Sequence, residues 1–173
     1  VRTALVCWMY AKNNHGKFIL RFDDTDLERS EERFISAIKE DLFWLGLNWD
    51  VEFKQSDRFR RYDEILDLLL KNGHVYECYE SKEELEIKRK MQLKSGKPPI
   101  YDRASLYLSE SEKQNAVLLG KKPYYRFKMN HDSTIRWNDQ IREEIVFLSK
   151  NISDPIIKRE DGSYTYMLPS VID

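Results

Sequence analysis

Apolar residues in the first 76 positions alternate between helical and strand spacing. Residues 3–14 are densely apolar, which predicts a mostly buried helix, and the β-rich run at 18–22 predicts a strand. Two amphipathic helices follow in the pattern, at 30–46 and at 57–73, and each of them ends at a glycine. Because helices and strands alternate in this way, residues 1–76 are typical of one α/β unit.

The rest of the chain has a different pattern. Ser81 and Glu84 have the spacing of a capping box, which predicts the start of a basic helix, and a second short helix is expected to end at Gly120. Apolar residues then alternate with charged ones at period two, which predicts three short strands in an antiparallel set. These alternating residues are Tyr125, Phe127, Met129, Ile135, Trp137, Ile145 and Phe147. The dipeptide Asp161-Gly162 predicts a hairpin turn.

Length and composition narrow the class of protein. With 173 residues, 41% of them hydrophobic, the chain can bury a core, which excludes a disordered tail. The longest apolar stretch, at 4–11, is far shorter than the roughly 20 residues that a membrane span requires. Cys7 and Cys78 lack the spacing of a disulfide scaffold, so we expect a soluble cytoplasmic protein. The chain starts without methionine and stops in mid-pattern, and we interpret it as an internal fragment.

Charge is unevenly distributed along a chain whose net charge is only −1. Residues 23–52 carry ten acids and three bases, whereas residues 82–128 carry twelve bases and six acids. The basic stretch also contains Tyr101, Tyr107, Tyr124 and Tyr125. Cations that neutralise phosphates beside rings that stack on bases are typical of a nucleic-acid surface, but taken alone the lysine-rich pattern favours a solvated helix face.

Acidic residues gather where the strand at 18–22 is expected to end. Residues 23–26 bring three aspartates and one threonine to the strand end at which open α/β sheets bind ligands. Like charges so close together need a compensating cation, and the ammonium of an amino acid would serve. Two alternatives stay open, namely carboxylates that cap a following helix and a metal loop, although the run lacks the central glycine of a calcium loop.

Several short segments form an ordered series along the chain. The most specific are residues 20–30 (LRFDDTDLERS) and residues 42–47 (LFWLGL). Further segments of the series lie at 1–5, 55–58, 76–85, 152–155 and 161–166. In this order and spacing, the series resembles the bacterial glutamyl-tRNA synthetase family of class I aminoacyl-tRNA synthetases.

The resemblance implies a fold, a domain order and an activity. The fold class would be α/β, part of a Rossmann-like class I catalytic domain with an inserted α+β domain that binds the tRNA acceptor stem. We expect the first half of the catalytic domain at 1–76, the inserted domain at 77–160 and the return into the catalytic domain at 161–173. The family joins L-glutamate to tRNA(Glu) through a glutamyl-adenylate, with ATP and Mg²⁺. Its two ATP motifs are not found in this sequence, so no catalytic residue is expected here and the chain alone should be inactive.

Site residues follow from the resemblance position by position. Asp23 stands where the family usually has a glutamate that meets the substrate ammonium, and Tyr166 and Ser170 fall in the glutamate pocket. The motif residues expected near the tRNA end and ATP are Asp24, Thr25 and Arg29. The residues expected to bind tRNA are Lys88, Arg89, Lys90 and Arg103.

Zinc is not expected in this chain. Some relatives hold zinc through a Cys-x-Cys pair followed later by a Tyr-x-Cys or similar pattern. Here Cys78 keeps the first thiol, Glu80 stands in place of the second, and residues 101–105 offer no further thiol. Fewer than the four ligands of a structural zinc site remain, so we predict neither zinc nor another bound metal ion.

Alternative functions stay open beside the glutamyl branch. A glutaminyl-tRNA synthetase is the nearest rival, but Asp26 and the segment 27–30 favour the glutamyl branch. The short tRNA-modifying relatives usually keep the zinc ligands, and a non-catalytic tRNA-binding module is a further possibility. The expected partners are tRNA(Glu), L-glutamate and ATP, with no membrane, and we expect a monomer in the cytoplasm.

Overall fold

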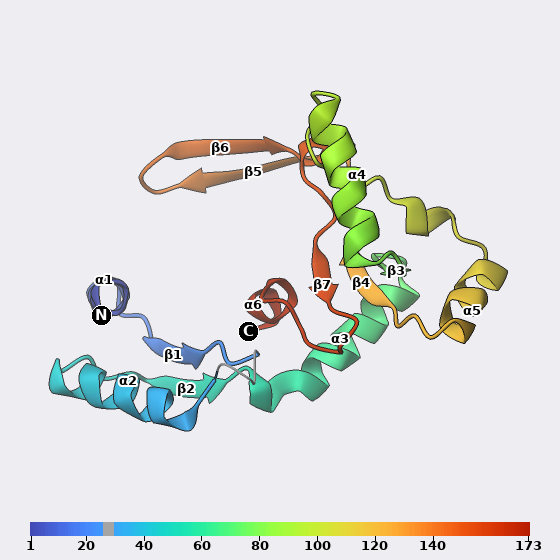
Figure 1. Ribbon diagram of the computed structural model, residues 1–173. Coiled ribbons are helices and arrows are strands. Elements are labelled where there is room, and N and C mark those ends of the chain that lie inside the picture. Colours follow the sequence, from blue (N-terminus) through green and yellow to red (C-terminus); the bar gives the residue numbers. More distant parts are fainter. Residues whose placement is uncertain (26–29) are drawn as a thin grey trace. The chain divides into compact units, whose positions relative to one another are not determined.

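The computed structural model describes residues 1–25 and 30–173 (Figure 1). The chain divides into two compact units, residues 1–63 and residues 64–173, and each unit is described by itself. Both units mix helices with short strands, as the sequence pattern predicts. Among the described residues, every helix is too short or too polar to cross a membrane.

The first unit contains a parallel pair of strands joined through a helix. β1 (Ile19–Phe22) pairs in parallel with β2 (Val51–Lys54), a strand that the sequence pattern does not predict. Parallel strands need a crossover connection, and here that connection contains α2 (Glu32–Trp44). The buried apolar side chains of this unit are Phe18, Phe22, Ile35, Leu42, Leu47 and Tyr62.

The first helix, α1 (Arg2–Asn13), forms where the sequence predicts it, but the prediction that it is mostly buried is wrong. None of its described residues is buried. Ala4, Trp8 and Ala11 are half-buried and recur at helical spacing, so one narrow stripe of the helix packs against other atoms. A dense apolar pattern identifies a helix, but it does not show how much of that helix the rest of the unit covers.

The second unit is built on a three-stranded antiparallel sheet. β3 (Val75–Cys78) and β7 (Ile156–Lys158) flank β4 (Tyr124–Phe127). β5 (Thr134–Asp139) and β6 (Glu143–Leu148) form a separate antiparallel hairpin. The expected grouping of β4, β5 and β6 in one set is therefore wrong, because period-two spacing marks a strand without identifying its partner.

Helices and short 3₁₀ turns connect these strands. They are α3 (Phe59–Lys71), α4 (Lys82–Lys94), α5 (Glu110–Leu118), α6 (Met167–Ile172), η1 (Ser56–Arg58), η2 (Ala104–Tyr107) and η3 (Ser149–Asn151). The capping box that opens α4 is confirmed: Oγ of Ser81 accepts from the Glu84 amide at 3.2 Å, and Oε2 of Glu84 accepts from the Ser81 amide at 2.6 Å. A second capping box, formed by Ser109 and Glu112, opens α5.

The predicted turn at Asp161-Gly162 is confirmed. Gly162 has a φ of 86°, a conformation that glycine adopts without steric cost. The amide of Arg159 donates to the carbonyl of Ser163 at 2.8 Å across the turn. The returning segment pairs with β7 through one bridge, so the hairpin is short.

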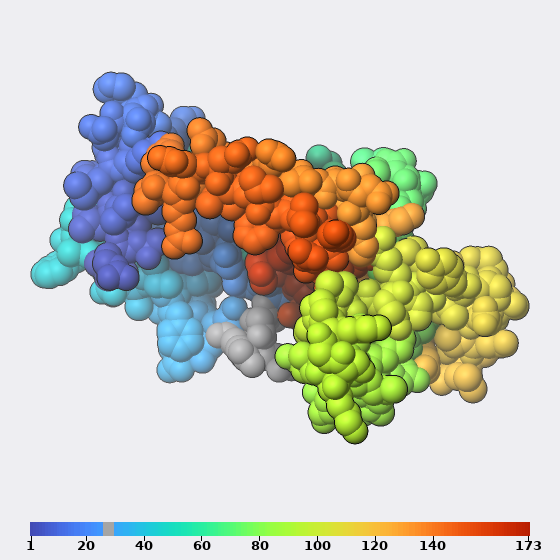
Figure 2. All heavy atoms as spheres, turned by 90° about the horizontal axis from the view of Figure 1, so that it is seen from above, coloured from blue at the N-terminus to red at the C-terminus, as the bar shows by residue number. Residues whose placement is uncertain are grey.

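The β5–β6 hairpin, orange in Figure 2 by its place in the sequence, has exposed apolar side chains. Cross-strand register places Ile135 opposite Phe147 and Trp137 opposite Ile145 on one face. The rings of Trp137 and Phe147 stack with their centroids 5.6 Å apart. This diagonal contact stabilises a hairpin whose side chains are otherwise largely exposed.

Asp154 braces the second unit from inside. Its side chain is fully buried, and its carboxylate pairs with Arg103 over 2.7 and 2.8 Å. Oη of Tyr76 donates to it at 2.7 Å, and the amide of Met129 donates at 3.0 Å. Burial alone would raise the pKa of Asp154, but these hydrogen bonds hold the pKa below its ordinary value. The carboxylate therefore joins β3, the segment before η2 and the segment after β4.

Removing this carboxylate should destabilise the protein strongly. Asp154→Ala leaves the Arg103 guanidinium, whose side chain is only 18% exposed, without its carboxylate partner, so we expect a loss of roughly 3 kcal/mol in the free energy of unfolding. Because the folded pKa of Asp154 is lowered, the stabilisation is present above the unfolded pKa of about 4 and is lost as the pH falls through the folded value. Urea titrations across this pH range measure both effects.

Arg136→Ala is the matched control for this prediction. Arg136 pairs with Glu144 on the exposed hairpin at 3.2 Å, and such surface pairs contribute about 1 kcal/mol or less. Equal losses for Asp154→Ala and Arg136→Ala would contradict the assignment of Asp154 as a brace.

Candidate functional site

The acidic end of β1 splits into one buried and one exposed carboxylate. Asp24 is buried, and its two oxygens accept from the amide of Ser56 at 2.8 Å and from Oγ of Ser56 at 2.6 Å. Asp23 is exposed, and its Oδ1 lies 2.8 Å from Nε of Arg21. Thr25 is half-buried, and Arg29 lies outside the described residues.

The two aspartates therefore have different chemistry available to them. Asp24 links the end of β1 to Ser56, the first residue of η1 after β2, so it fixes the ends of both parallel strands. Asp23 keeps its carboxylate at the surface, where Arg21 is its neighbouring cation. An incoming ammonium can meet Asp23 by sharing or replacing Arg21, whereas Asp24 cannot turn outward without losing its two hydrogen bonds.

Tyr166 and Ser170 lie on one helical turn of the second unit. Tyr166 precedes α6 and is 69% exposed, and Ser170 is an exposed residue within α6. The amide of Ser170 donates to the carbonyl of Tyr166 at 3.0 Å, so both side chains belong to the same face of the helix. Asp23 belongs to the other compact unit, and a pocket shared by Asp23 with these two residues stays a prediction.

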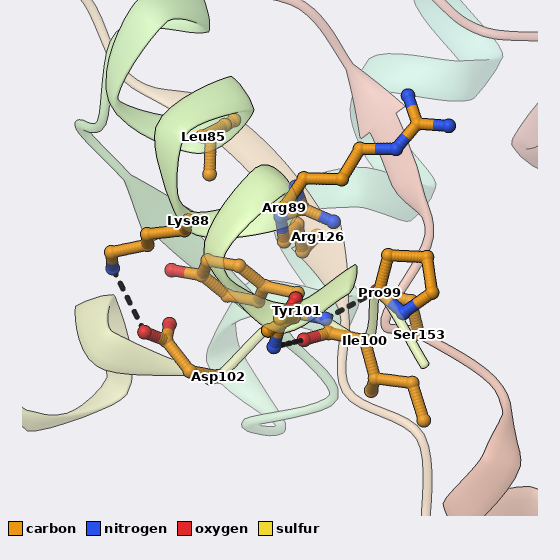
Figure 3. A pocket seen from close by; sticks show the side chains of 10 residues that line it. Leu85, Lys88, Arg89, Pro99, Ile100, Tyr101, Asp102, Arg126 and Ser153 are labelled. Carbon is orange, nitrogen blue, oxygen red and sulfur yellow. Dashed lines mark hydrogen bonds and ion pairs between the residues drawn. The ribbon is translucent and has the colours of Figure 1, made fainter. Parts of the chain in front are cut away.

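A pocket of about 150 Å³ lies between α4 and the segment that follows it (Figure 3). It is lined by Leu85, Lys88, Arg89, Gln92, Pro99, Ile100, Tyr101, Asp102, Arg126 and Ser153. Hydrogen bonds hold its wall in place: Nε2 of Gln92 donates to the carbonyl of Ile100 at 2.6 Å, and the amide of Tyr101 donates to Oγ of Ser153 at 3.0 Å. The pocket combines three cationic side chains, one carboxylate and an aromatic ring.

The cations expected to bind tRNA have different surroundings. Lys88 and Arg89 both line the pocket, and Nζ of Lys88 pairs with Asp102 at 2.9 Å. Arg89 and Lys90 are exposed, with Glu86 3.8 Å and 4.0 Å away. Arg103 is instead committed to Asp154 inside the unit, so its guanidinium is not on the surface with the other three. Of these four predicted cations, the three on α4 are therefore positioned to meet an external anion directly.

Arg126 is a pocket residue that the sequence pattern does not single out. It is buried, with its guanidinium 4.1 Å from the ring centre of Tyr101 and 5.4 Å from that of Tyr124. Within the described residues, its Nε has no hydrogen-bond partner. The alternation along β4 did not signal this, because it sets the apolar Tyr125 and Phe127 apart from the charged residues, whereas the buried face carries Tyr124 and Arg126.

The surroundings of Cys78 do not fit a zinc site. Burial raises the pKa of the Cys78 thiol to about 11, and its sulfur lies 3.8 Å from Oη of Tyr101. The neighbouring Glu80 already accepts hydrogen bonds on both of its oxygens. Across residues 1–25 and 30–173, no three His, Cys, Asp or Glu side chains gather as metal ligands. One protonated thiol is a poor donor set for zinc, and the expectation of a zinc-free chain stays a prediction.

Comparisons with known proteins match the whole chain. A family model described as the catalytic domain of class I tRNA synthetases (E and Q) matches residues 1–173. Glutamate–tRNA ligase 2 of Ehrlichia canis is 60% identical and glutamate–tRNA ligase 1 of Wolbachia pipientis subsp. Culex pipiens is 57% identical, each over 100% of this chain. The chain spans 39% of the length of each of these relatives.

Solved structures show the same similarity. A crystal structure of a glutamate tRNA ligase from Elizabethkingia meningosepticum, in complex with its amino acid, is similar with a TM-score of 0.87 and 30% identity. The match covers 99% of this chain and 38% of that chain. A glutamate-tRNA synthetase structure from Elizabethkingia anophelis has the same TM-score and identity. These likenesses agree with the α/β, Rossmann-like fold class expected from the sequence.

The different surroundings of Asp23 and Asp24 predict different effects on stability. Asp24→Ala removes the two carboxylate oxygens that accept from the amide and Oγ of Ser56. Because Asp24 is buried, we expect a loss of about 1–3 kcal/mol in the free energy of unfolding. Asp23→Ala removes an exposed pair and should cost less than about 1 kcal/mol. Chemical denaturation of both variants measures the difference, and a larger loss for Asp23→Ala would reverse the assignment.

Proposed function

The chain belongs to the class I tRNA synthetases for glutamate and glutamine, and we propose from this premise that the protein containing it joins L-glutamate to tRNA(Glu). The observation that carries the proposal is the identity of 57% and 60%, along the whole chain, to relatives named glutamate–tRNA ligase. These names favour glutamate over glutamine, which the family description leaves open. The likeness to a ligase solved with its amino acid supports the same substrate class.

The proposed reaction belongs to the whole protein. This chain spans 39% of the length of the relatives named above. The carboxylate of glutamate would attack ATP, with Mg²⁺ bound to its phosphates, and release pyrophosphate to leave glutamyl-adenylate. A hydroxyl at the 3′ end of tRNA(Glu) would then take the glutamyl group, with release of AMP. The two ATP motifs that the family resemblance implies are not among these 173 residues, so we assign no catalytic residue here and expect no activity from the chain alone.

We assign Asp23, Tyr166 and Ser170 to the binding of glutamate. Asp23 supplies an exposed carboxylate for the ammonium, and Tyr166 offers a largely exposed ring one helical turn from Ser170. Asp24 and Thr25, with Arg29 beside them in the sequence, would shape the loop near the tRNA end and ATP. The two hydrogen bonds of Asp24 to Ser56 support a positioning role for this carboxylate.

We assign the α4 pocket and the exposed face next to it to the RNA backbone. Lys88 and Arg89 bring two cations to a concave wall, and Lys90 adds a third on the exposed helix. Phosphates of a polynucleotide are the anions that such a group of cations recognises. Arg103 would act indirectly, because its bridge to Asp154 fixes the segment that leads into η2.

The remaining expectations concern the whole protein. We propose that residues 1–76 and 161–173 belong to the catalytic domain and that residues 77–160 form the inserted domain that binds the acceptor stem. A monomer in the cytoplasm is part of the same proposal. The proposal requires no zinc, because burial favours the protonated thiol of Cys78.

Pyrophosphate exchange into ATP, with tRNA present in the assay, tests the proposed reaction. The purified full-length protein should catalyse exchange with glutamate and not with glutamine. Asp23→Asn should lower the use of glutamate by at least about tenfold while tRNA affinity is unchanged, because the variant loses the charge pair between residue 23 and the substrate ammonium. Exchange with glutamine alone would favour a glutaminyl enzyme, and tRNA binding without any exchange would favour a non-catalytic module.

Charge reversal on α4 tests the proposed RNA surface. The triple variant Lys88→Glu, Arg89→Glu, Lys90→Glu should bind tRNA more weakly and with a shallower salt dependence. Its log–log slope should fall by about 0.7–0.9 for each phosphate that α4 no longer neutralises. Lys71→Glu, an exposed lysine at the end of α3, is the matched control. An unchanged slope in the triple variant would show that α4 does not meet the RNA.

A further inference from the structure

A polar cluster lies next to the α4 pocket and meets the assigned RNA contacts at two points: Tyr101 lines the pocket, and Nζ of Lys88 lies 3.9 Å from Oε1 of Glu80. Its centre is Glu80, a half-buried carboxylate between β3 and α4. Three hydroxyls donate to it: Oη of Tyr101 at 2.6 Å, Oγ of Ser105 at 2.7 Å and Oη of Tyr124 at 3.2 Å. The sulfur of Cys78 lies 3.8 Å from Oη of Tyr101. The cluster thus gathers side chains from three segments, 78–80, 101–105 and β4, around one charge.

The polar groups of this cluster hold one another in place. One oxygen of Glu80 accepts from Tyr101, and the other accepts from Ser105 and Tyr124. The amide of Ser105 also donates back to Oη of Tyr101 at 3.2 Å. Burial alone would raise the pKa of Glu80, but these donors lower it, so the anionic form is the one that the cluster stabilises. Satisfied buried networks of this kind rigidify the segments that they join.

The cluster is arranged like a closed structural metal site, but with a central anion and hydrogen-bond donors in place of a central cation and its ligands. Such a site ties separate segments to a central cation, with ligand atoms about 3.3–3.8 Å from one another around tetrahedral zinc. Here the sulfur of Cys78 and Oη of Tyr101 are separated by a comparable 3.8 Å, but the central charge is the carboxylate of Glu80. The single thiol, kept protonated by burial, makes the same cluster unsuitable for zinc itself.

We propose that Glu80 performs, through hydrogen bonds, the task of a structural metal ion. It is a positioning residue that clamps the end of β3, η2 and β4 together and fixes Tyr101. Tyr101 in turn forms a wall of the α4 pocket, where the Arg126 guanidinium stacks on its ring and Ser153 accepts from its amide (Figure 3). The clamp itself does not rest on the proposed function; only its effect on RNA does.

Thermal unfolding of the purified full-length protein tests the clamp. Glu80→Gln keeps the size of the side chain but places an amide donor among three hydroxyl donors. Its midpoint should fall by about 5 °C or more relative to Glu40→Gln, which changes an exposed carboxylate of α2. Ser105→Ala removes one donor and should give a smaller fall in the same direction, and it carries the test if Glu80→Gln does not fold.

The metal content of the purified protein is the second test of the clamp. The wild type should hold no stoichiometric zinc, and a chelator should leave its midpoint unchanged. Glu80→Cys combined with Ser105→Cys puts two new thiols beside Cys78, so this variant should bind one zinc ion per chain. Cobalt in its place should give a thiolate charge-transfer band, and added zinc should raise the midpoint back toward that of the wild type.

Three results would overturn the clamp. They are stoichiometric zinc in the wild type, midpoints of Glu80→Gln and Ser105→Ala equal to the control, and a double-cysteine variant that takes up neither zinc nor cobalt. For RNA, Glu80→Gln should raise the KM for tRNA by about tenfold with the KM for glutamate unchanged, and the zinc-loaded double variant should reverse the change. If stability and metal content follow the clamp while the RNA effect is missing, the failure lies with the proposed RNA surface.

Discussion

A carboxylate removed from water must be paired, and in the second unit this constraint determines where the chain can go. Asp154 has a fully buried side chain, and its pairing with Arg103 requires the segment before η2 to pass close to the segment before β7. The same carboxylate accepts from Tyr76 on β3 and from the amide of Met129 beyond β4. The sheet order β3-β4-β7 and the start of the hairpin are therefore tied to one charged group.

The division of the basic residues between inside and outside follows from this constraint. Arg103 and Arg126 are held within the unit, by the carboxylate and the carbonyl of Asp154, and Arg126 also stacks on tyrosine rings. The cations of α4 remain at the surface, where Asp102 and Glu86 are exposed or half-exposed partners and these pairs are weak; Lys88 also lies 3.9 Å from the more buried Glu80. These two arginines shape the interior of the unit, and the α4 cations are available for an anion. A count of lysines and arginines in the sequence therefore overstates the positive charge at the surface.

Local features of the chain were predictable, and non-local ones were not. Helix ends at glycines and the capping box at Ser81 depend on neighbours within four residues, and the structure has them where the sequence predicts them. The partner of Asp24 is Ser56, which is 32 residues away, and Arg103 finds Asp154 across 51 residues, distances at which spacing carries no signal. The acidic strand end was visible in the sequence, but the separation of Asp23 and Asp24 into surface and interior needed the parallel pairing of β1 with β2.

The arrangement of the second unit depends on the pairing of Asp154, and the amide of Met129 reports that pairing directly. This amide donates to Oδ1 of Asp154 at 3.0 Å, outside the regular strand hydrogen bonds. Hydrogen exchange followed by NMR should show the Met129 amide protected as strongly as the amides of β3 and β4, because it opens only when the brace opens. Exchange of the Met129 amide as fast as that of an exposed loop, with β3 and β4 still protected, would contradict the central place of Asp154.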